Sequence, residues 1–454
     1  MAMKHYARSQ SMCEWDALDA WRLQIRGVLS REEGRQVSPF LLLALSGVSA
    51  DEQRHCAELW VRDQLAVARL ERADLAFVFP RLEKTKLRLG YLSADFHEHA
   101  TALLMVELFE CHDHGRFEVF AYSCGADDGK GMRQRLEASF DRFADIQGLT
   151  DIEAASLIYR DEVDILIDLK GYTQGTRSAI LNFRPAPIQV NYLGYPGTLG
   201  GDVCDYIVTD AFVTPTDSAP DYTEAFAYMP DSYQPHGRHG LISAKPSRAK
   251  AGLPEEGFVF CCFNQAYKIT PEIFNVWCYL LLSVPGSVLW LLKTPLAEGN
   301  LLREAFHRGI TADRIIFASN CPQSDHLARL QLADLVLDTA PYNAHTTASD
   351  ALWAGVPIIT CAGDTFASRV AGSVLHAIGL EELVTTDLDQ YFELALILAS
   401  DAGKLAQLKE KLAANRMTTA LFGVEGYTRH LETLYDMMWR KYLNGERPGA
   451  ISTA

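Results

Sequence analysis

The stretch 334-DLVLDTAPYNAHTTASDALWAGVPIIT-360 places polar, reactive side chains where an apolar strand passes through a loop into a helix. His345, Thr346 and Thr347 stand at the corner between loop and helix, and Asp350 lies three residues beyond Thr347. Thr favours the N-cap of a helix, and the free N–H groups and dipole of a helix N-terminus bind anions. The corner therefore predicts an anion site, although a capped helix beside an ordinary loop histidine would explain the same residues.

The overall charge of the chain explains why such a corner would be useful. Among 454 residues, 42 Lys and Arg face 58 Asp and Glu, which gives a net charge of −16. This acidity argues against nucleic acid or an anionic membrane as a partner. A small anionic ligand would then need a local region of positive potential, and a helix N-terminus supplies one without a charged side chain.

The cysteines and the N-terminal residues indicate a compartment. No apolar run reaches the length of a membrane span, and the opening MAMKHYARSQSM lacks the apolar region of a signal peptide. The ten cysteines are scattered, and none forms a CxxC pair. Scattered cysteines without a secretion signal are typical of reduced thiols in the cytosol, so we expect a cytoplasmic protein.

Two patterns of hydrophobic periodicity divide the first half of the chain. Residues 1–80 repeat apolar residues at helical spacing, in 15–30 and again in 50–70, which predicts helices without strands. From Leu87 onward, short apolar runs alternate with amphipathic segments. The expected strands are 87–93, 117–123, 164–169, 188–194 and 205–210, with helices at 101–112, 130–139, 151–161 and 177–183. Such alternation predicts βαβ units and a parallel sheet.

The alternation of strands and helices stops and then starts again. Residues 211–255 are rich in Pro, Ser, Asp and Gly and indicate a linker zone. Further strands are expected at 258–263, 287–293, 314–318, 335–339 and 357–361, and the chain ends in helices at 388–414 and 426–442.

We therefore predict three parts. These are a helical cap or linker over 1–80, a Rossmann-like domain over 81–240, and a second Rossmann-like domain over 241–454 that includes the closing helices. Ligands of doubly wound sheets lie outside the carboxyl ends of the strands, so the cleft between the two domains is the expected site.

Four segments, in this order, resemble the catalytic region of the protein O-GlcNAc transferases, a family that includes the plant SPINDLY-type proteins. They are GYLSADFHEHAT (90–101), RPAPIQVNYLGYPGT (184–198), FNQAYKITPEIFNVW (263–277) and NAHTTASDALWAGVPIIT (343–360). The resemblance extends from Leu87 to Tyr442, and it is that of a bacterial-type member. It implies a GT-B fold, with two Rossmann-like domains facing a cleft. It also implies an inverting glycosyltransferase that needs neither a metal nor a cofactor.

The resemblance assigns roles on the nucleotide-sugar side. Lys268 resembles the lysine that contacts the donor diphosphate, and Gln265 and Tyr267 lie in the same motif. His326 resembles the histidine that stacks on uracil, and Arg329 follows it one turn later.

The corner described first also matches the family. His345, Thr346 and Thr347 resemble its diphosphate-binding corner, and Asp350 resembles the aspartate that helps hold the nucleotide. The physical argument indicates an anion site at this corner, and the independent resemblance implies that the anion is the diphosphate of a nucleotide sugar.

Other matched residues belong to the opposite side of the expected cleft. His99 resembles the histidine that reaches into the site from the other domain, and Asp95 and Thr101 match its neighbours. Gly194 and Pro196 lie in the motif that lines the sugar and acceptor side, although the glycines there would also suit a tight loop. An imidazole titrates near neutral pH, so His99, oriented by Asp95, is the best candidate for a base. Alternatively, His99 contacts the sugar or phosphate, and the donor phosphate accepts the proton.

The sequence departs from the family pattern in three places. The array of tetratricopeptide repeats that precedes the catalytic region of the family is not in this sequence. Animal members carry a histidine in the helical linker, where 38-SPFLLLALSG-47 has none. Gln323 stands where the family has a lysine near the uridine.

These observations predict transfer of GlcNAc from UDP-GlcNAc to a Ser or Thr hydroxyl of a protein or peptide, with UDP as product. The alternatives are a transferase that uses another nucleotide sugar such as GDP-fucose, a UDP-GlcNAc 2-epimerase-like enzyme, and a non-catalytic nucleotide-sugar binder of the same fold.

Overall fold

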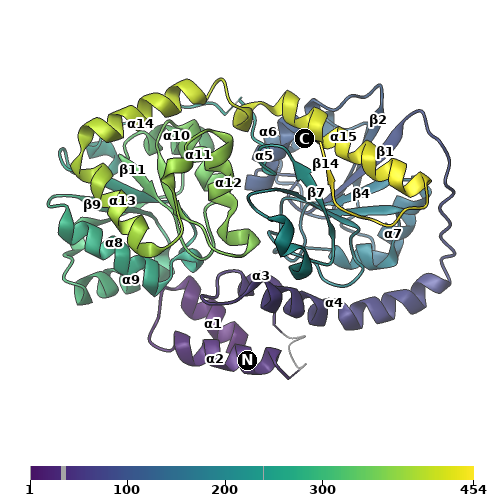
Figure 1. Ribbon diagram of the computed structural model, residues 1–454, viewed down its shortest axis with the longest axis horizontal. Coiled ribbons are helices and arrows are strands. Elements are labelled where there is room, and N and C mark those ends of the chain that lie inside the picture. The colour runs from purple at the N-terminus through teal and green to yellow at the C-terminus, as the bar shows by residue number, and fades with distance from the viewer. Residues whose placement is uncertain (1, 32–36, 239, 454) are drawn as a thin grey trace. The chain divides into compact units, whose positions relative to one another are not determined.

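The computed structural model describes residues 2–31, 37–238 and 240–453 (Figure 1). The chain divides into two compact units, each with one sheet. The first, named the His99 unit, comprises Leu29–Leu42, Ser49–Gly237 and Phe422–Ala454. The second, named the Lys268 unit, comprises Met1–Val28, Leu43–Val48 and Arg238–Leu421.

The N-terminal region is helical, as predicted. It contains α1 (Ala2–Ser11), α2 (Leu18–Leu29), α3 (Pro39–Leu42) and α4 (Ala50–Ala73). The longest of these, α4, starts at a capping box in which Ser49 and Glu52 satisfy each other's backbone N–H groups. Helix α1 and most of α2 belong to the Lys268 unit, whereas α3 and α4 belong to the His99 unit. Met1 and residues 32–36 of the predicted helical region lie outside the described residues.

The His99 unit is built on a parallel sheet with the order β14-β7-β6-β5-β4-β1-β2-β3. Its strands are β1 (Leu87–Ser93), β2 (Phe117–Ser123), β3 (Arg142–Asp145), β4 (Ile165–Asp168), β5 (Ile188–Asn191), β6 (Tyr206–Asp210), β7 (Ala225–Met229) and β14 (Ile451–Ser452). Its helices after α4 are α5 (Ala100–Glu110), α6 (Gly131–Ala138), α7 (Asp151–Arg160) and α15 (Val424–Leu443), with 3-10 helices η2 (Ser178–Phe183) and η3 (Thr216–Asp221). The central strands β4, β5 and β6 are buried along their whole length, as expected for parallel strands covered on both faces.

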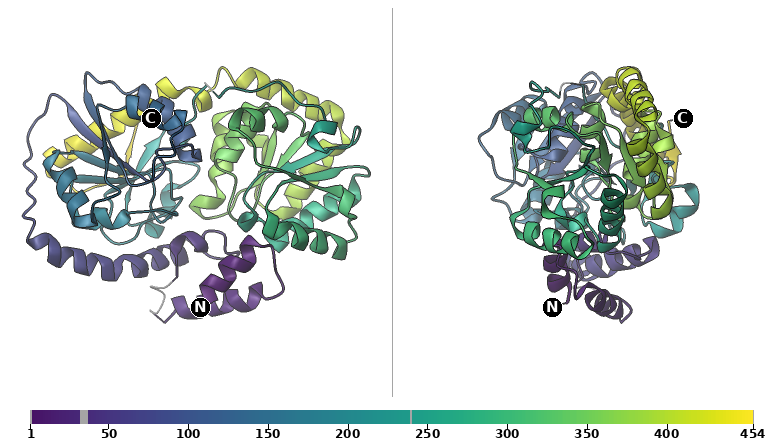
Figure 2. Two further views of the ribbon diagram at one scale, coloured as in Figure 1. Left: turned by 180° about the vertical axis from the view of Figure 1, so that it is seen from behind. Right: turned by 90° about the vertical axis from the view of Figure 1, so that its left-hand side faces the viewer.

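The Lys268 unit has a parallel sheet with the order β10-β9-β8-β11-β12-β13. Its strands are β8 (Val259–Cys262), β9 (Val288–Leu292), β10 (Ile315–Ala318), β11 (Leu335–Leu337), β12 (Ile358–Cys361) and β13 (Val384–Thr385). Its helices are α8 (Pro271–Ser283), α9 (Pro295–His307), α10 (Gln323–Leu330), α11 (Thr346–Trp353), α12 (Val370–Ala377), α13 (Leu388–Ser400) and α14 (Ala402–Asn415). Short 3-10 helices, of which η5 (Ala266–Lys268) matters below, complete the unit. Helices cover both faces of each sheet (Figure 2).

Both sheets share one topology, which fixes where a ligand can bind. In each, the first strand lies between the second and the fourth, so the winding reverses between β1 and β4 and between β8 and β11. The loops that leave these neighbouring strands part to opposite faces and open a crevice at the carboxyl edge. The expected pair of Rossmann-like domains is therefore confirmed, and every predicted strand is present within a few residues of its predicted bounds.

Several local predictions were wrong. In place of the predicted helix 177–183, the chain forms the 3-10 helix η2. This helix ends before Arg184, whose backbone is left-handed with φ of 50°. Strands β3, β7, β13 and β14 were missed, and β7 lies within the expected linker 211–255. Predicted helix 388–414 is two helices, because Asp401 ends α13 and caps α14.

The C-terminal helix belongs to a different unit from the one predicted. Helix α15 was placed with the domain 241–454, but it packs in the His99 unit. Its Glu432 accepts a hydrogen bond from the Asp113 backbone at 2.8 Å, and its Tyr427 hydroxyl lies 2.6 Å from that of Tyr192. Buried polar partners of this kind fix the helix to one sheet. Among the described residues, no helix combines the length and apolarity needed to cross a bilayer.

Candidate functional site

The crevice of the Lys268 unit is formed by the residues that follow β8 and β11. Asn264 leaves β8, and its side-chain amide donates to Asp338 at 3.2 Å and to the Thr339 hydroxyl at 2.8 Å, both of which follow β11. Thr347, in the first turn of α11, donates its hydroxyl to the Asn264 amide oxygen. One buried amide thus ties both strand ends to the helix N-terminus and fixes their geometry.

Lys268 is buried at this crevice. Its ammonium donates to the Asn343 carbonyl at 2.8 Å and lies 3.8 Å from the centre of the Tyr342 ring. Burial lowers the pKa of Lys268 to about 8, although the charge of Asp338 opposes the shift. Burial likewise raises the pKa of Asp338 to about 6. At neutral pH the lysine is charged and incompletely hydrated, so it gains from meeting an anion.

The corner before α11 differs in detail from the prediction. The N-cap is His345, whose side chain makes no capping bond, and Thr347 bonds Asn264 instead. Within the described residues, the backbone N–H groups of Thr346 and Thr347 have no acceptor. Burial, with Lys268 adding to it, holds the pKa of His345 well below its ordinary value, so the ring is neutral. The helix therefore begins with open donors, as an anion site requires.

His326 and Arg329 act as one unit on α10. An Arg329 Nη donates to His326 Nδ1 at 2.8 Å, so Nδ1 must be the acceptor and Nε2 carries the proton. Burial and the charge of Arg329 lower the pKa of His326 to about 4, which keeps it neutral. Both lie against Phe263, at 5.3 Å between ring centres for His326 and 4.7 Å for the Arg329 guanidinium. His326, Asn264 and Thr347 line one small cavity.

A larger cavity of 480 Å³ lies beside Arg329. It is bordered by the carboxyl end of β10 and the loop that follows, including Ser319, Asn320 and Cys321. Its volume is within the range of small-molecule sites. Arg329, whose guanidinium donates to the Ser319 carbonyl, places a planar cation at its wall.

Asp350 lies on the inner face of α11 and is buried. Its carboxylate accepts a hydrogen bond from the Gln323 amide at 3.1 Å. Burial raises the pKa of Asp350 to about 7, against the effect of that bond. The residue that departs from the family pattern is thus the direct partner of a predicted nucleotide-binding residue.

The turn that carries Lys268 is supported from the start of the chain. The Gln10 amide of α1 donates to the carbonyls of Tyr267 at 3.0 Å and Ile269 at 3.2 Å. Tyr267 is partly buried beside Tyr342, whereas Gln265 is exposed. Nothing in the sequence near Gln10 indicated this contact, since the two segments are 257 residues apart.

The crevice of the His99 unit lies at the carboxyl ends of β1 and β4. Asp95 follows β1 and is buried, and Lys170 follows β4 and is also buried. The ammonium of Lys170 donates to both carboxylate oxygens of Asp95, at 2.9 and 2.7 Å, and the Thr101 hydroxyl donates to Asp95 at 3.4 Å. Asp168 holds the turn by accepting the N–H of Lys170 at 3.0 Å.

His99 stands at the edge of this charged pair and caps α5. Its Nδ1 accepts the N–H of Thr101 at 3.2 Å and lies 3.3 Å from Asp95. Nδ1 cannot both accept from the backbone and donate to a carboxylate, and burial lowers the pKa of His99, with Lys170 adding to the effect. The capping bond therefore corresponds to a neutral ring with its proton on Nε2. In that state the side chain, which is 42% exposed, presents a donor and not a free lone pair.

Gly194 and Pro196 lie in the loop after β5. A Cβ at Gly194 would stand 1.9 Å from the Leu169 carbonyl oxygen, so glycine is required by close packing on the neighbouring β4 turn. Pro196 is buried. The buried Glu224 fixes the loop by accepting the Leu199 N–H at 2.7 Å and the Thr198 hydroxyl. The tight-loop interpretation thus explains Gly194 without a ligand.

Sequence reasoning missed the residues that hold the site together. Lys170, Asn264 and Asp338 were not selected, although each lies one or two residues after one of the four strands that form the crevices. Their position at strand ends beside a change of winding was a usable signal. The pairing of Lys170 with Asp95 was not, because it depends on the strand order.

The chain is similar in sequence to known glycosyltransferases. The family described as Glycosyl transferase family 41 matches residues 53–242 and 238–431. The Arabidopsis thaliana protein named "Probable UDP-N-acetylglucosamine--peptide N-acetylglucosaminyltransferase SEC" is 41% identical over 371 residues, which cover 80% of this chain and 38% of that protein. The Caenorhabditis elegans UDP-N-acetylglucosamine–peptide N-acetylglucosaminyltransferase is 31% identical, with 79% and 41% covered. The chain thus spans about two fifths of the length of these relatives.

A solved structure extends the agreement to the fold. A mutant of the Thermobaculum terrenum O-GlcNAc transferase superposes with a TM-score of 0.84 at 29% identity, covering 96% of this chain and 83% of that one. A sucrose-phosphate synthase from Thermosynechococcus elongatus, at 12% identity and a TM-score of 0.52, shares the fold alone. The expected GT-B class of two parallel-sheet α/β domains is confirmed.

Proposed function

The chain belongs to glycosyltransferase family 41, and we propose that it is an inverting transferase that moves GlcNAc from UDP-GlcNAc to a Ser or Thr hydroxyl of a protein. The observation that carries the proposal is the crevice of the Lys268 unit. There, a buried ammonium lies at a helix N-terminus whose first N–H groups have no acceptor among the described residues. Both features favour a phosphate-bearing ligand.

Departure of the nucleotide is the step that this crevice would assist. Cleavage of the sugar–phosphate bond leaves negative charge on the diphosphate, and preorganised donors stabilise that charge as it develops. Lys268 and the N–H groups of Thr346 and Thr347 are such donors, fixed in advance by Asn343 and Asn264. We assign them to the diphosphate.

The remaining donor-side residues are assigned to the nucleoside. The neutral His326 ring lies tilted beside Phe263, and its hydrogen bond from Arg329 fixes its orientation, which suits stacking on a base. Asp350, with Gln323, is assigned to hydrogen bonding with the nucleotide. Gln265 and Tyr267 complete the motif around Lys268.

The acceptor's proton is the second requirement of the reaction. We propose that His99 donates from Nε2 to the donor sugar or phosphate, and that the donor phosphate takes the acceptor proton. The capping bond from Thr101 to Nδ1 supports this choice between the two roles. Asp95 and Thr101 then act as positioning residues for His99.

The proposal is tested by incubating the purified chain with candidate proteins and UDP-GlcNAc and measuring intact mass. A mass increase of one N-acetylhexosamine on a Ser or Thr is expected. GDP-fucose in a parallel reaction, giving turnover while UDP-GlcNAc gives none, would overturn the donor assignment. Release of free ManNAc without an acceptor would instead show an epimerase, and tight binding of UDP without turnover would show a non-catalytic binder.

A further inference from the structure

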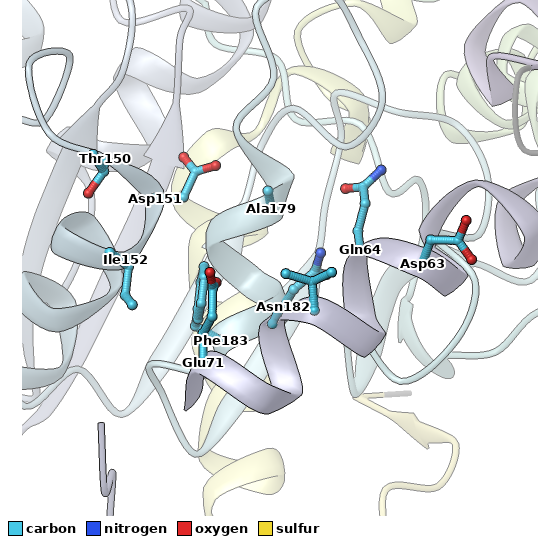
Figure 3. Close-up of a pocket in the computed structure, with 11 residues that line it drawn as sticks. Asp63, Gln64, Glu71, Thr150, Asp151, Ile152, Ala179, Asn182 and Phe183 are labelled. Carbon is cyan, nitrogen blue, oxygen red and sulfur yellow. The ribbon is translucent and has the colours of Figure 1, made fainter. Parts of the chain in front are cut away.

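A groove in the His99 unit lies apart from both crevices. It runs between α4, the first turn of α7 and the 3-10 helix η2, and its volume is 540 Å³ (Figure 3). We name it the α4 groove. Its polar lining residues are Asp63, Gln64, Glu71, Thr150, Asp151 and Asn182.

The charge of the α4 groove has one sign. Its lining contains the carboxylates of Asp63, Glu71 and Asp151 and no Lys, Arg or His. Arg177 pairs with Asp151 at 2.6 Å, and Arg62 lies 3.7 Å from Asp63. Glu71 has no ion pair among the described residues, so one carboxylate stays uncompensated. A cationic group on the ligand would complement it.

Asn182 provides the second, independent feature. It is 4% exposed, yet its side-chain oxygen is buried without a hydrogen-bond partner among the described residues. Figure 3 shows it rising from η2 into the space between η2 and α4. A buried oxygen without a donor is costly, and the backbone N–H of a bound peptide would supply one.

The walls of the α4 groove suit an extended chain with long side chains. Val67 is 56% exposed, and the buried Ala68 and Phe183 continue the apolar surface beside it. Aliphatic stems of Lys and Arg cover such surface while their charged ends reach nearby carboxylates. No group of His, Cys, Asp and Glu side chains in the described ranges could hold a metal ion, so a bare cation is the weaker match.

We propose that the α4 groove binds an extended protein segment that carries Lys or Arg. Its backbone pairs with the Asn182 amide, and its basic side chain meets Glu71 and Asp63. Resting on the proposed function, this segment belongs to the acceptor protein, whose docking here is separate from the reaction itself.

The test measures binding without any nucleotide sugar. Fluorescence anisotropy compares a fluorescein-labelled peptide GSKGKSG with GSQGQSG at low salt. We expect the basic peptide to bind about fivefold more tightly, the scale of one solvent-exposed ion pair, and its binding to weaken as salt rises. D63N/E71Q should remove that preference, and Asn182→Leu should weaken both peptides.

A matched control separates the α4 groove from overall charge. E393Q/E410Q changes the net charge by the same amount at exposed positions of α13 and α14, and it should leave binding unchanged. Equal binding of the two peptides, equal loss in the control, or no loss in D63N/E71Q would overturn the proposal. Surface substitutions such as D63N/E71Q do not threaten the core, so the test does not depend on the folding of Asn182→Leu.

The outcome is distinguishable from that of the proposed function. Preferential binding of GSKGKSG without any sugar transfer would support the docking site and contradict the activity. Sugar transfer to acceptors, together with equal binding of GSKGKSG and GSQGQSG, would support the activity and contradict the docking site.

Discussion

The two crevices have the same topology and opposite electrostatics. Each lies where the winding reverses, between β1 and β4 or between β8 and β11. After β1 and β4, Asp95 and Lys170 neutralise each other at 2.7 Å. After β8 and β11, Lys268 bonds the Asn343 carbonyl and faces the Tyr342 ring, and no described carboxylate forms an ion pair with it. The fold supplies two equivalent positions, and the charge pattern makes only one of them ready for an anion.

The helices that leave the two crevices differ in the same way. Helix α5 is capped by His99, which accepts the Thr101 N–H. Helix α11 has no side-chain cap, and the N–H groups of Thr346 and Thr347 have no acceptor in the part of the chain that the structure describes. A capped N-terminus has already used the donors that an anion would need. The comparison supports our proposal that the Lys268 unit binds the diphosphate and that the His99 unit hydrogen-bonds neutral groups.

The largest effect is expected from breaking the ion pair between Lys170 and Asp95. Lys170→Met would leave Asp95 buried without its cation and should cost about 3–5 kcal/mol of the free energy of unfolding. Adding Asp95→Asn should restore part of that loss, because no uncompensated charge remains. Urea unfolding measures both, and a loss under about 1 kcal/mol in Lys170→Met would remove the contrast between the crevices.

Lys268→Met tests the other crevice through catalysis. Removing one preorganised donor to developing charge should lower kcat by about 10²–10³. Stability should change less than in Lys170→Met, because Asp338 keeps its hydrogen bonds from Ala344 and Thr360. Steady-state sugar transfer gives the rate, and Lys404→Met, on the exposed side of α14, serves as the control. A kcat within tenfold of the parent would contradict the diphosphate assignment.

The pH dependence of UDP binding should distinguish the crevices further. The pKa of Lys268 is about 8, so its ammonium is lost as pH rises from 7 to 9. The charged form binds the anion, so UDP affinity should fall by up to about tenfold over that range. Titration calorimetry at several pH values measures this. In Lys268→Met the fall should vanish, and any slope that persists would belong to Asp350, whose pKa is about 7.

The smallest effect concerns the support of the Lys268 turn. Gln10→Ala removes two hydrogen bonds to the backbone of Tyr267 and Ile269. Each is worth about 1 kcal/mol, so UDP affinity should weaken a few-fold while kcat at saturation changes little. Arg8→Ala, in the same helix, is the matched control. If UDP affinity weakened equally in both variants, the effect would belong to α1 in general and not to Gln10.

The sequence allowed much of this to be predicted, and the reasons for the misses are physical. The alternation of short apolar runs with amphipathic segments predicted the strands and the two sheets, because burial determines where apolar residues stand. Short edge strands such as β13 and β14 bury too few side chains to produce a recognisable apolar pattern in the sequence. His345 was predicted at the corner before α11, but its role as N-cap depends on Asn264 holding Thr347, a contact across the sheet. Helix α15 was misplaced because its buried tyrosines resemble any amphipathic surface until their partners are known.

The contact between α1 and the Lys268 turn joins two equilibria. If the docking of α1 stabilises UDP binding by some free energy, bound UDP stabilises the docking of α1 by the same amount, because coupling free energies are reciprocal. Amide hydrogen exchange in Ala2–Ser11 should therefore slow when UDP is present. Conversely, a force or partner that lifts α1 from Tyr267 and Ile269 would loosen the nucleotide from a distance.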